Sequence, residues 1–220
     1  MGMVNLAVSR PRVCAIVPAA GAARRMGTQK LLLPAGNQPM IARVVNQLRG
    51  CGLTALIVVI GRSGGAIAEA LLRHLAAELR AITTIRTNPD PAGDMLSSVR
   101  EGLRGAPVDC DGVLLLPADL AAISAEVAQE LVRGFAAARD RIFVPTHGGR
   151  RGHPMVFPAA YREEILTHYD ATGLRGLLAA HPEAVTELEV ASPAVLLDVD
   201  APADYERALA LLGLAPPASA

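Results

Sequence analysis

The stretch VCAIVPAAGAARRMGTQKLLLPAG, residues 13–36, joins an apolar, β-branched run to a loop of small residues that carries three basic side chains. The run at residues 13–17 has the length and composition of a buried strand. Residues 18–21 are too small to obstruct a ligand, so their backbone could face a base or a phosphate. The loop contains neither G-x-G-x-x-G nor G-x-x-x-x-G-K-[ST], so neither common phosphate-binding loop explains it.

Runs of this kind recur along the chain, and segments with helical periodicity lie between them. The predicted strands are residues 13–17, 56–60, 82–85, 113–116 and 142–144, and the predicted helices are residues 39–49, 66–79, 95–103 and 125–138. This alternation predicts a three-layer, Rossmann-like α/β fold whose mixed, mostly parallel sheet is covered on both faces. In such sheets ligands bind beyond the carboxyl ends of the strands, which directs attention to the loops that follow them.

The pattern loosens after residue 144. We expect a strand at residues 150–158, helices at 159–169 and 172–181, strands at 185–190 and 195–199, and a last helix that starts at Ala201-Pro202. No repeat or linker interrupts this order. Residues 1–214 are therefore predicted to form one domain, followed by a loose tail at residues 215–220.

Composition narrows the class of function. The 21 basic and 21 acidic side chains balance, so no long-range field favours nucleic acid or an anionic membrane. We expect a cytoplasmic protein, because no apolar run approaches the roughly 18 residues that span a bilayer and the start lacks a signal-peptide pattern. Cys14, Cys51 and Cys110 are odd in number and widely spaced, which predicts buried thiols rather than disulfides or a zinc site.

The segment AAGAARRMGTQKLLLP, residues 19–34, resembles the opening A-A-G-x-x-x-R-M-G-x-x-K-L-L-x-P of the MobA-like nucleotidyltransferases, nearest to the molybdenum-cofactor cytidylyltransferases. That family moves a nucleoside monophosphate from a nucleoside triphosphate to a phosphorylated acceptor and releases pyrophosphate. The resemblance implies that Arg25 and Lys30 hold the triphosphate and act in catalysis. It also implies backbone contacts to the nucleotide from Ala19, Ala20 and Gly21.

A second segment, NPDPAGDMLSSVREGL at residues 88–103, resembles the same family's N-P-x-x-x-x-G-M-x-S-S-[LV]-x-x-G-[LV]. Ser97 and Ser98 would then bind the nucleotide at a helix start, where hydroxyls and free N–H groups can meet a ribose or phosphate. They could equally serve as simple helix caps. Asp94 stands where the family has glycine, and its carboxylate would repel a triphosphate.

Carboxylates at two distant places suggest a metal site. LLLPADLAAIS, residues 114–124, resembles L-x-G-D-x-P-x-[VI]-[ST], in which the aspartate binds Mg²⁺, although Ala121 replaces the usual proline. Residues 197–209 resemble D-[IV]-D-T-P-x-D-Y. Alternation along a strand would put Asp198 and Asp200 on the same face. Their carboxylates would repel each other there unless a cation lay between them. Mg²⁺ is thus the expected cofactor, bound by Asp119 and one of these two. Helix capping is the alternative role for Asp119 and Asp200.

The segment GGRRGHPMVF, residues 148–157, matches G-x-x-G-H-P, which marks the molybdenum-cofactor branch of the family. Gly152, His153 and Pro154 are the predicted acceptor-binding residues, with Arg150 and Arg151 as candidate phosphate contacts. A solvated glycine hairpin is the alternative. Residues 170–178, DATGLRGLL, weakly resemble G-D-x-G-x-R-x-L-L and give Arg175 no assigned role.

Together these features predict a Mg²⁺-dependent nucleotidyltransferase that uses CTP and a phosphorylated acceptor, most similar to the enzymes that act on molybdenum cofactor. CTP is favoured over GTP because guanylyl-transferring relatives show A-G-G where this chain has Ala20, whose methyl group narrows the space beside the base. The product would pass to a molybdoenzyme or its chaperone, and no nucleic-acid or membrane partner is expected.

Two alternatives stay open. One is a nucleotidyltransferase for another small phosphate, such as a sugar phosphate or phospholactate, and the other is a nucleotide-binding module without catalysis. The methylerythritol-phosphate cytidylyltransferases share the P-A-A-G-x-x-x-R-M opening but place P-K-Q farther on, which residues 27–30 do not fit.

Overall fold

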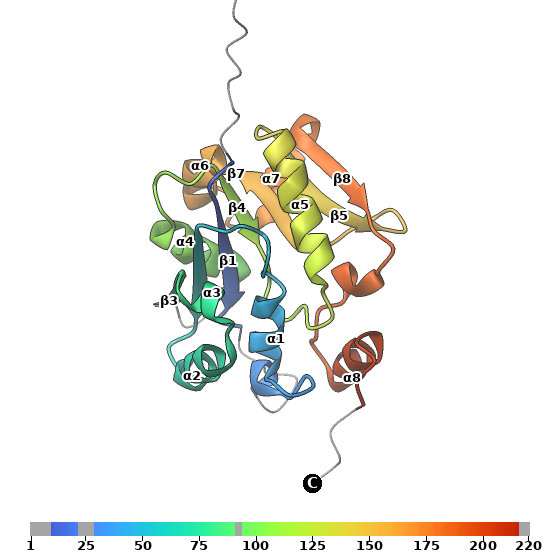
Figure 1. Cartoon of the computed structure of the whole chain (residues 1–220). Coiled ribbons are helices and arrows are strands. Elements are labelled where there is room, and N and C mark those ends of the chain that lie inside the picture. The colour runs from blue at the N-terminus through green and yellow to red at the C-terminus, as the bar shows by residue number, and fades with distance from the viewer. Residues whose placement is uncertain (1–9, 22–28, 91–93, 216–220) are drawn as a thin grey trace, which may run out of the picture.

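The computed structural model describes residues 10–21, 29–90 and 94–215 of the 220-residue chain. In this part of the chain, eight strands form one sheet in the order β3-β2-β1-β4-β7-β5-β6, with β8 paired to β5 (Figure 1). The strands are β1 Val13–Ala19, β2 Ala55–Ile60, β3 Thr83–Thr87, β4 Gly112–Leu115, β5 Ile142–His147, β6 Arg150–Arg151, β7 Met155–Pro158 and β8 Val185–Glu189.

The pairing is mostly parallel, as predicted. β1 pairs in parallel with both β2 and β4, β2 with β3, and β5 with β8. β7 runs antiparallel between β4 and β5, and β6 pairs antiparallel with β5, so the sheet is mixed. The parallel half brings the carboxyl ends of β1, β2, β3 and β4 to one edge, where open sheets of this kind bind ligands.

Helices cover both faces, which gives the predicted three layers (Figure 1). One face packs against α1 Met40–Asn46, α2 Gly65–His74, α3 Ala77–Arg80, α5 Ala125–Ala137 and α8 Pro202–Leu211. The other packs against α4 Met95–Gly105, α6 Arg162–Thr167 and α7 Leu174–Ala180. Short 3₁₀ turns are η1 Lys30–Leu32, η2 Ala159–Tyr161, η3 Pro182–Ala184 and η4 Pro193–Leu196.

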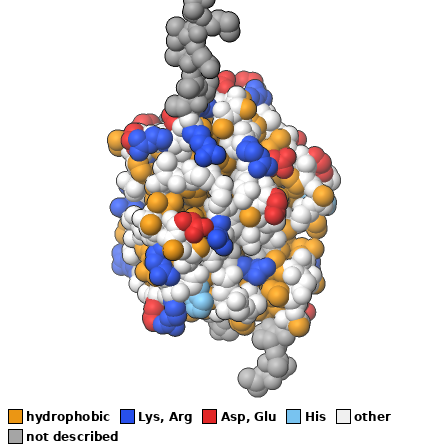
Figure 2. All heavy atoms as spheres, in the orientation of Figure 1, with side chains coloured by type: hydrophobic (Ala, Val, Ile, Leu, Met, Phe, Trp, Pro, Cys, Tyr) orange, Lys and Arg blue, Asp and Glu red, His pale blue; other side chains and the backbone are white. Residues whose placement is uncertain are grey.

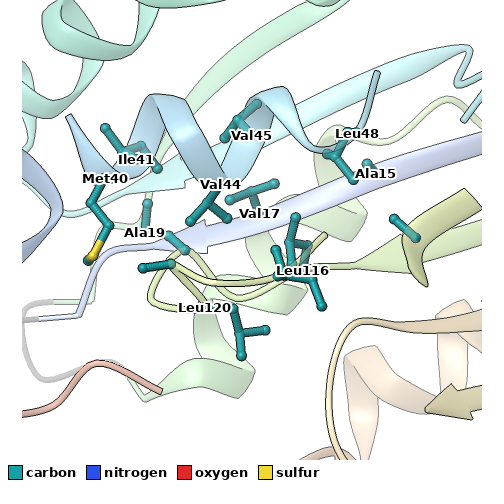
Figure 3. Close-up of a cluster of buried hydrophobic side chains, with 14 of the residues drawn as sticks. Ala15, Val17, Ala19, Met40, Ile41, Val44, Val45, Leu48, Leu116 and Leu120 are labelled. Carbon is teal, nitrogen blue, oxygen red and sulfur yellow. The ribbon is translucent and has the colours of Figure 1, made fainter. Parts of the chain in front are cut away.

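β1 divides the hydrophobic core in two, because successive side chains on a strand point to opposite faces. Ala15 and Val17 belong to the cluster under α1, where Val44 and Leu48 pack over them (Figure 3). Ile16 points the other way, into the cluster beneath α4. Each face of the strand therefore carries its own helical layer.

The predicted helix at residues 66–79 is wrong in its length, since the chain is extended at Leu75 and two helices, α2 and α3, form instead. The cause is Asn46 of α1, whose amide donates to His74 O at 3.1 Å and whose Oδ1 accepts from Ala76 N at 3.0 Å. One side chain thus satisfies backbone groups on both sides of the break.

Two predicted strands also differ from the structure. The segment at residues 150–158 forms two strands, β6 and β7, with a cis His153–Pro154 peptide between them. Residues 195–199 form no strand: η4 occupies the start, because Pro193 lacks an N–H and the Ser192 hydroxyl accepts from Ala194 N.

The three cysteines are free and buried, as predicted. No helix in the described ranges combines the length and hydropathy needed to cross a membrane. On the face shown in Figure 2, acidic and basic side chains are interspersed, in keeping with the balanced net charge of the chain.

The contact between α4 and β1 yields a stability prediction. A Cβ on Gly102 would lie 2.4 Å from Ile16 Cγ2, inside the buried core. Gly102→Ala should lower the free energy of unfolding by about 1–2 kcal/mol, because overpacking costs about 1–3 kcal/mol and exceeds the helix-propensity gain of about 1 kcal/mol. Gly65→Ala, in α2 with nothing within 4 Å, is the control and should be neutral or stabilising. Urea denaturation of both variants measures the difference, and equal stability would contradict tight packing at Gly102.

Candidate active site

The ammonium group of Lys30 lies between two carboxylates at the carboxyl edge of the sheet. Its Nζ donates hydrogen bonds of 3.0 Å to Asp119 Oδ2 and 3.0 Å to Asp200 Oδ1, so these two oxygens are at most about 6 Å apart. Only 11% of the Lys30 side chain and 21% of the Asp119 side chain are exposed. The structure therefore brings together three predicted site residues that are far apart in the sequence.

The backbone explains how these residues meet. Asp119 follows β4, and Ala118 N donates to Pro18 O, which keeps the segment beside the end of β1. Asp119 O in turn accepts from Val199 N at 3.0 Å. Val199 is buried while Asp198 and Asp200 are exposed, so the predicted alternation survives although residues 195–199 form no strand.

The cluster has more negative than positive charge. Burial opposes the charged form of Lys30, but Asp119 and Asp200 together hold its pKa above the usual value. The pKa of Asp198 is raised by burial and by the nearby carboxylates of Asp119 and Asp200, with Lys30 acting in the opposite direction. Three carboxylates thus share one described ammonium group, an arrangement that favours a further cation. Arg25, the other predicted catalytic cation, lies outside the described residues.

The donor set fits a magnesium ion that is completed by substrate. Asp119 Oδ1 is buried and has no hydrogen-bond partner among the residues that the structure describes. The described residues contain no group of three or more histidine, cysteine or acidic side chains arranged to hold a metal alone. Mg²⁺ does not need one, because it commonly binds through one or two carboxylates and the phosphate oxygens of its substrate.

The predicted nucleotide loop begins where β1 ends. Ala19 is buried at the end of the strand, Ala20 is half-buried and Gly21 is exposed. Gly61, directly after β2, lies against Ala20: a Cβ at Gly61 would be 3.3 Å from Ala20 O. The absence of a side chain at Gly61 lets the two strand ends approach closely.

The start of α4 is organised by an asparagine that sequence reasoning missed. Asn88 is buried after β3, and its amide donates to the hydroxyls of Ser97 at 2.8 Å and Ser98 at 3.0 Å. The sequence does point to Asn88, because it comes shortly after a predicted strand and begins the N-P pair of the family motif. Asp94 caps α4 by accepting from Ser97 N at 2.8 Å. Ser98 is 3% exposed and Ser97 is half-buried, and nucleotide binding by either serine stays a prediction.

A cavity of about 740 Å³ opens beside this cluster. It lies between the β5–β6 hairpin, the start of α4, α7 and the segment around η4, and Asp198 is part of its wall. A second, more open hollow of about 510 Å³, between η1, α1 and α2, contains none of the predicted site residues.

Gly152 and His153 line the cavity, whereas Pro154 is buried behind them. His153 N donates to Val195 O at 2.9 Å, and a Cβ on Gly152 would lie 2.2 Å from the same oxygen, so only glycine fits there. The Nδ1 atom of His153 is buried without a hydrogen-bond partner in the described part of the chain. Two of the three predicted acceptor residues therefore share a cavity with Asp198.

The chain has an α/β sheet with a cluster of carboxylates and one lysine beside a ligand-sized cavity. Together with the family match, these features define it as a nucleotidyltransferase. The sequence profile of the MobA-like NTP transferase domain matches residues 15–185. The chain belongs to this family.

Individual relatives agree with the family. The molybdenum cofactor cytidylyltransferase of Escherichia coli (strain K12) is 25% identical over 191 residues, which is 86% of this chain and 92% of the relative. The 2-C-methyl-D-erythritol 4-phosphate cytidylyltransferase of Frankia casuarinae is 33% identical over 171 residues, 77% of this chain and 56% of the relative. The crystal structure of Rv0371c from Mycobacterium tuberculosis superposes with a TM-score of 0.77 at 25% identity, covering 90% of this chain and 98% of that one.

Because Lys30 offsets the repulsion among the carboxylates, removing its ammonium group should destabilise the folded chain. Lys30→Met should lower the free energy of unfolding at pH 7 by about 1–3 kcal/mol, the range for hydrogen bonds to charged groups. Arg49→Met is the control, since both partners of its 2.8 Å pair with Glu78 are exposed and the change should affect stability less. Denaturant unfolding in the presence of a chelator measures both, and a Lys30 variant as stable as the parent would mean that the carboxylates do not depend on this ammonium.

Proposed function

We propose that the chain transfers CMP from CTP to the phosphate group of a molybdopterin-type acceptor, in a Mg²⁺-dependent reaction that releases pyrophosphate. The observation that carries this proposal is the Lys30 ammonium between Asp119 and Asp200, beside a cavity bordered by His153 and Asp198. The similarity to the molybdenum cofactor cytidylyltransferase of E. coli supports both the nucleotide and the acceptor.

The chemistry would be a direct displacement. An oxygen of the acceptor phosphate attacks the α-phosphorus of CTP, and a new oxygen–phosphorus bond forms. The bond from the α-phosphorus to the oxygen shared with the β-phosphorus breaks, and pyrophosphate leaves with that electron pair. Lys30 and Arg25 would neutralise charge on the triphosphate. Positioning and charge neutralisation are the main contributions of a protein to such transfers, so no side-chain nucleophile is required.

Asp119, with either Asp198 or Asp200, would hold the metal. The Mg²⁺ supplies charge neutralisation and orientation of phosphate oxygens when it is bound. Support for this assignment comes from the unpartnered Oδ1 of Asp119 and from the excess negative charge of the cluster.

The lining of the cavity supports a ring-shaped acceptor over a small polyol. Its walls include the apolar side chains of Val144, Met155, Leu178 and Leu196, and its volume of about 740 Å³ lies within the range of sites for drug-sized ligands. Apolar walls favour the faces of a flat heterocycle such as a pterin, whereas the hydroxyls of a polyol would lose hydrogen bonds to water there.

A polyol phosphate is nevertheless the second candidate acceptor, because the Frankia relative, at 33% identity, is a methylerythritol-phosphate cytidylyltransferase. The deciding experiment incubates the chain with Mg²⁺, labelled nucleoside triphosphates and a panel of phosphorylated acceptors that includes molybdopterin and methylerythritol phosphate. Pyrophosphate release and the mass of the product identify the acceptor. No turnover with any combination would favour a nucleotide-binding module without catalysis.

The role proposed for Asp119 predicts the behaviour of its amide variant. Asp119→Asn keeps the shape of the side chain and removes its charge, so turnover should fall by about 100-fold or more, as when one electrostatic stabiliser is lost from an active site. Asp109→Asn is the control, because Asp109 pairs with Arg12 on the surface, and this change should leave turnover unaffected. Pyrophosphate release at saturating Mg²⁺ measures both variants. Parent-like turnover in Asp119→Asn would exclude it as a metal ligand.

If the methyl group of Ala20 favours CTP by narrowing the space beside the base, removing it should weaken the preference for CTP over GTP. Ala20→Gly should reduce the discrimination between CTP and GTP by about 1–3 kcal/mol, the usual size of small steric changes in a pocket. The measurement is the ratio of kcat/KM for the two nucleotides in the parent and the variant. A parent enzyme that prefers GTP would overturn the cytidylyl assignment and leave the nucleotidyltransferase class intact.

A further inference from the structure

The side of α7 that borders the cavity carries one cation, Arg175. Leu174, Arg175, Leu178 and Ala179 all line the cavity, and their spacing places them on one side of the helix. Leu177 points to the other side and is buried in the core with α4. Arg175 is exposed and makes no hydrogen bond or ion pair within the described residues. Its guanidinium group is thus available to a ligand in the cavity.

Contacts away from the cavity fix the chain that leads into α7. Arg100 of α4 extends its guanidinium across to α6 and to the segment between α6 and α7. There it donates to Ile165 O at 2.9 Å, His168 O at 2.6 Å and Asp170 Oδ1 at 2.5 Å. Only 16% of the Arg100 side chain is exposed. The helix that carries Ser97 and Ser98 therefore also positions the segment before α7.

The turn before α7 is held in a strained conformation. Tyr169 has a φ of 78°, in the left-handed region that is costly for a bulky residue. Its hydroxyl donates to Glu164, which also accepts from His181 Nε2 at 2.9 Å. A Cβ on Gly176 would lie 2.4 Å from the Tyr169 ring, so α7 packs closely on this turn. These contacts leave α7, and with it the backbone of Arg175, little freedom to move.

Arg175 also acts electrostatically on His153, one of the predicted acceptor-binding residues. Burial lowers the pKa of His153, nearby Asp119 opposes this, and nearby Arg175 lowers the pKa further. Arg150 and Arg151 line the same cavity. Arg151 is already paired with Glu187 at 2.6 Å. His153 is thus close to Asp119 and to Arg175, and its unpartnered Nδ1 is a second polar atom without a described partner in this region.

We propose that Arg175 binds the attacking phosphate group of the acceptor and thereby selects phosphorylated acceptors over their alcohols, an inference that rests on the function proposed above. A guanidinium group matches a phosphate through two parallel hydrogen bonds. It would also offset the repulsion that Asp94 and Asp198 exert on an anion entering the cavity. Because Arg175, His153 and Asp198 line the same cavity, a phosphate at Arg175 would share that cavity with one carboxylate of the cluster.

The test measures binding and does not depend on turnover. The probes are 6-hydroxymethylpterin phosphate and the corresponding alcohol, titrated into the full chain and followed by pterin fluorescence. The parent should bind the phosphate ester about 10- to 100-fold more tightly than the alcohol, as expected for hydrogen bonds to charged groups. Arg175→Ala should lose this preference and keep the affinity for the alcohol, and Arg175→Lys should recover part of it because the charge returns without the planar fork.

Arg104→Ala is the control, since it removes a half-exposed arginine that pairs with Glu101 at 3.5 Å and does not line the cavity, and it should keep the preference. Thermal unfolding of each variant checks the fold, which an exposed side chain such as Arg175 should not disturb. An Arg175→Ala variant that still prefers the ester as strongly as the parent would overturn the proposal. A parent that prefers neither the pterin ester nor the erythritol ester described next over its alcohol would overturn it as well.

A second pair of probes, erythritol 4-phosphate and erythritol, separates this proposal from the choice of acceptor. If only the polyol ester binds in an Arg175-dependent way, the role of Arg175 stands and the pterin acceptor is wrong. If the pterin ester is tightly bound and converted, but equally well without Arg175, the proposed function stands and the role of Arg175 is wrong.

Discussion

The burial of β1 between two parallel neighbours is the constraint on which the rest of the structure depends. Every residue of this strand is buried, with β2 and β4 bonded along its two edges and helices packed on its two faces. Such a strand cannot shift without breaking two ladders and two cores. Its carboxyl end is consequently fixed beside Gly61 and Ala118, the residue before Asp119, so the middle of the fold determines where the site lies.

The site itself is assembled from groups that do little for folding. Carboxylates at Asp119, Asp198 and Asp200 repel one another, and partial burial together with this repulsion raises the pKa of Asp198. The fold tolerates them through one ammonium group and through exposure of the two later aspartates. Strain at Tyr169, in the turn before α7, is likewise held by surrounding contacts. The mutually repelling carboxylates thus lie beside the cavity, where a ligand could neutralise them.

The strands and the family could be predicted from the sequence because both depend on local order: apolar β-branched runs, and residues at fixed spacing after them. The break at Leu75 could not, because its cause is Asn46, on another helix. The strand expected at residues 195–199 failed for a related reason. Its alternation is real, but Ser192 and Pro193 set a 3₁₀ turn that the pattern of apolar residues does not reveal. Asp119 and Asp200 could be predicted as site residues from their places in the sequence motifs. The contact of Lys30 with both could not, because it depends on distances that only the fold defines.

The ammonium group at the centre of the site has a chemical consequence for the whole chain. Of the 21 basic side chains, 20 are arginines, and Lys30 is the only lysine in the sequence. An ammonium nitrogen is compact and carries three donors, so it can contact two carboxylates and still offer a third hydrogen, which suits it to the space between Asp119 and Asp200 better than a planar guanidinium. The sequence therefore has a single ε-amino group, and that group lies in the candidate active site. Acylating or Schiff-base-forming reagents that modify lysine side chains have one target here, whose accessibility changes with whatever occupies the site.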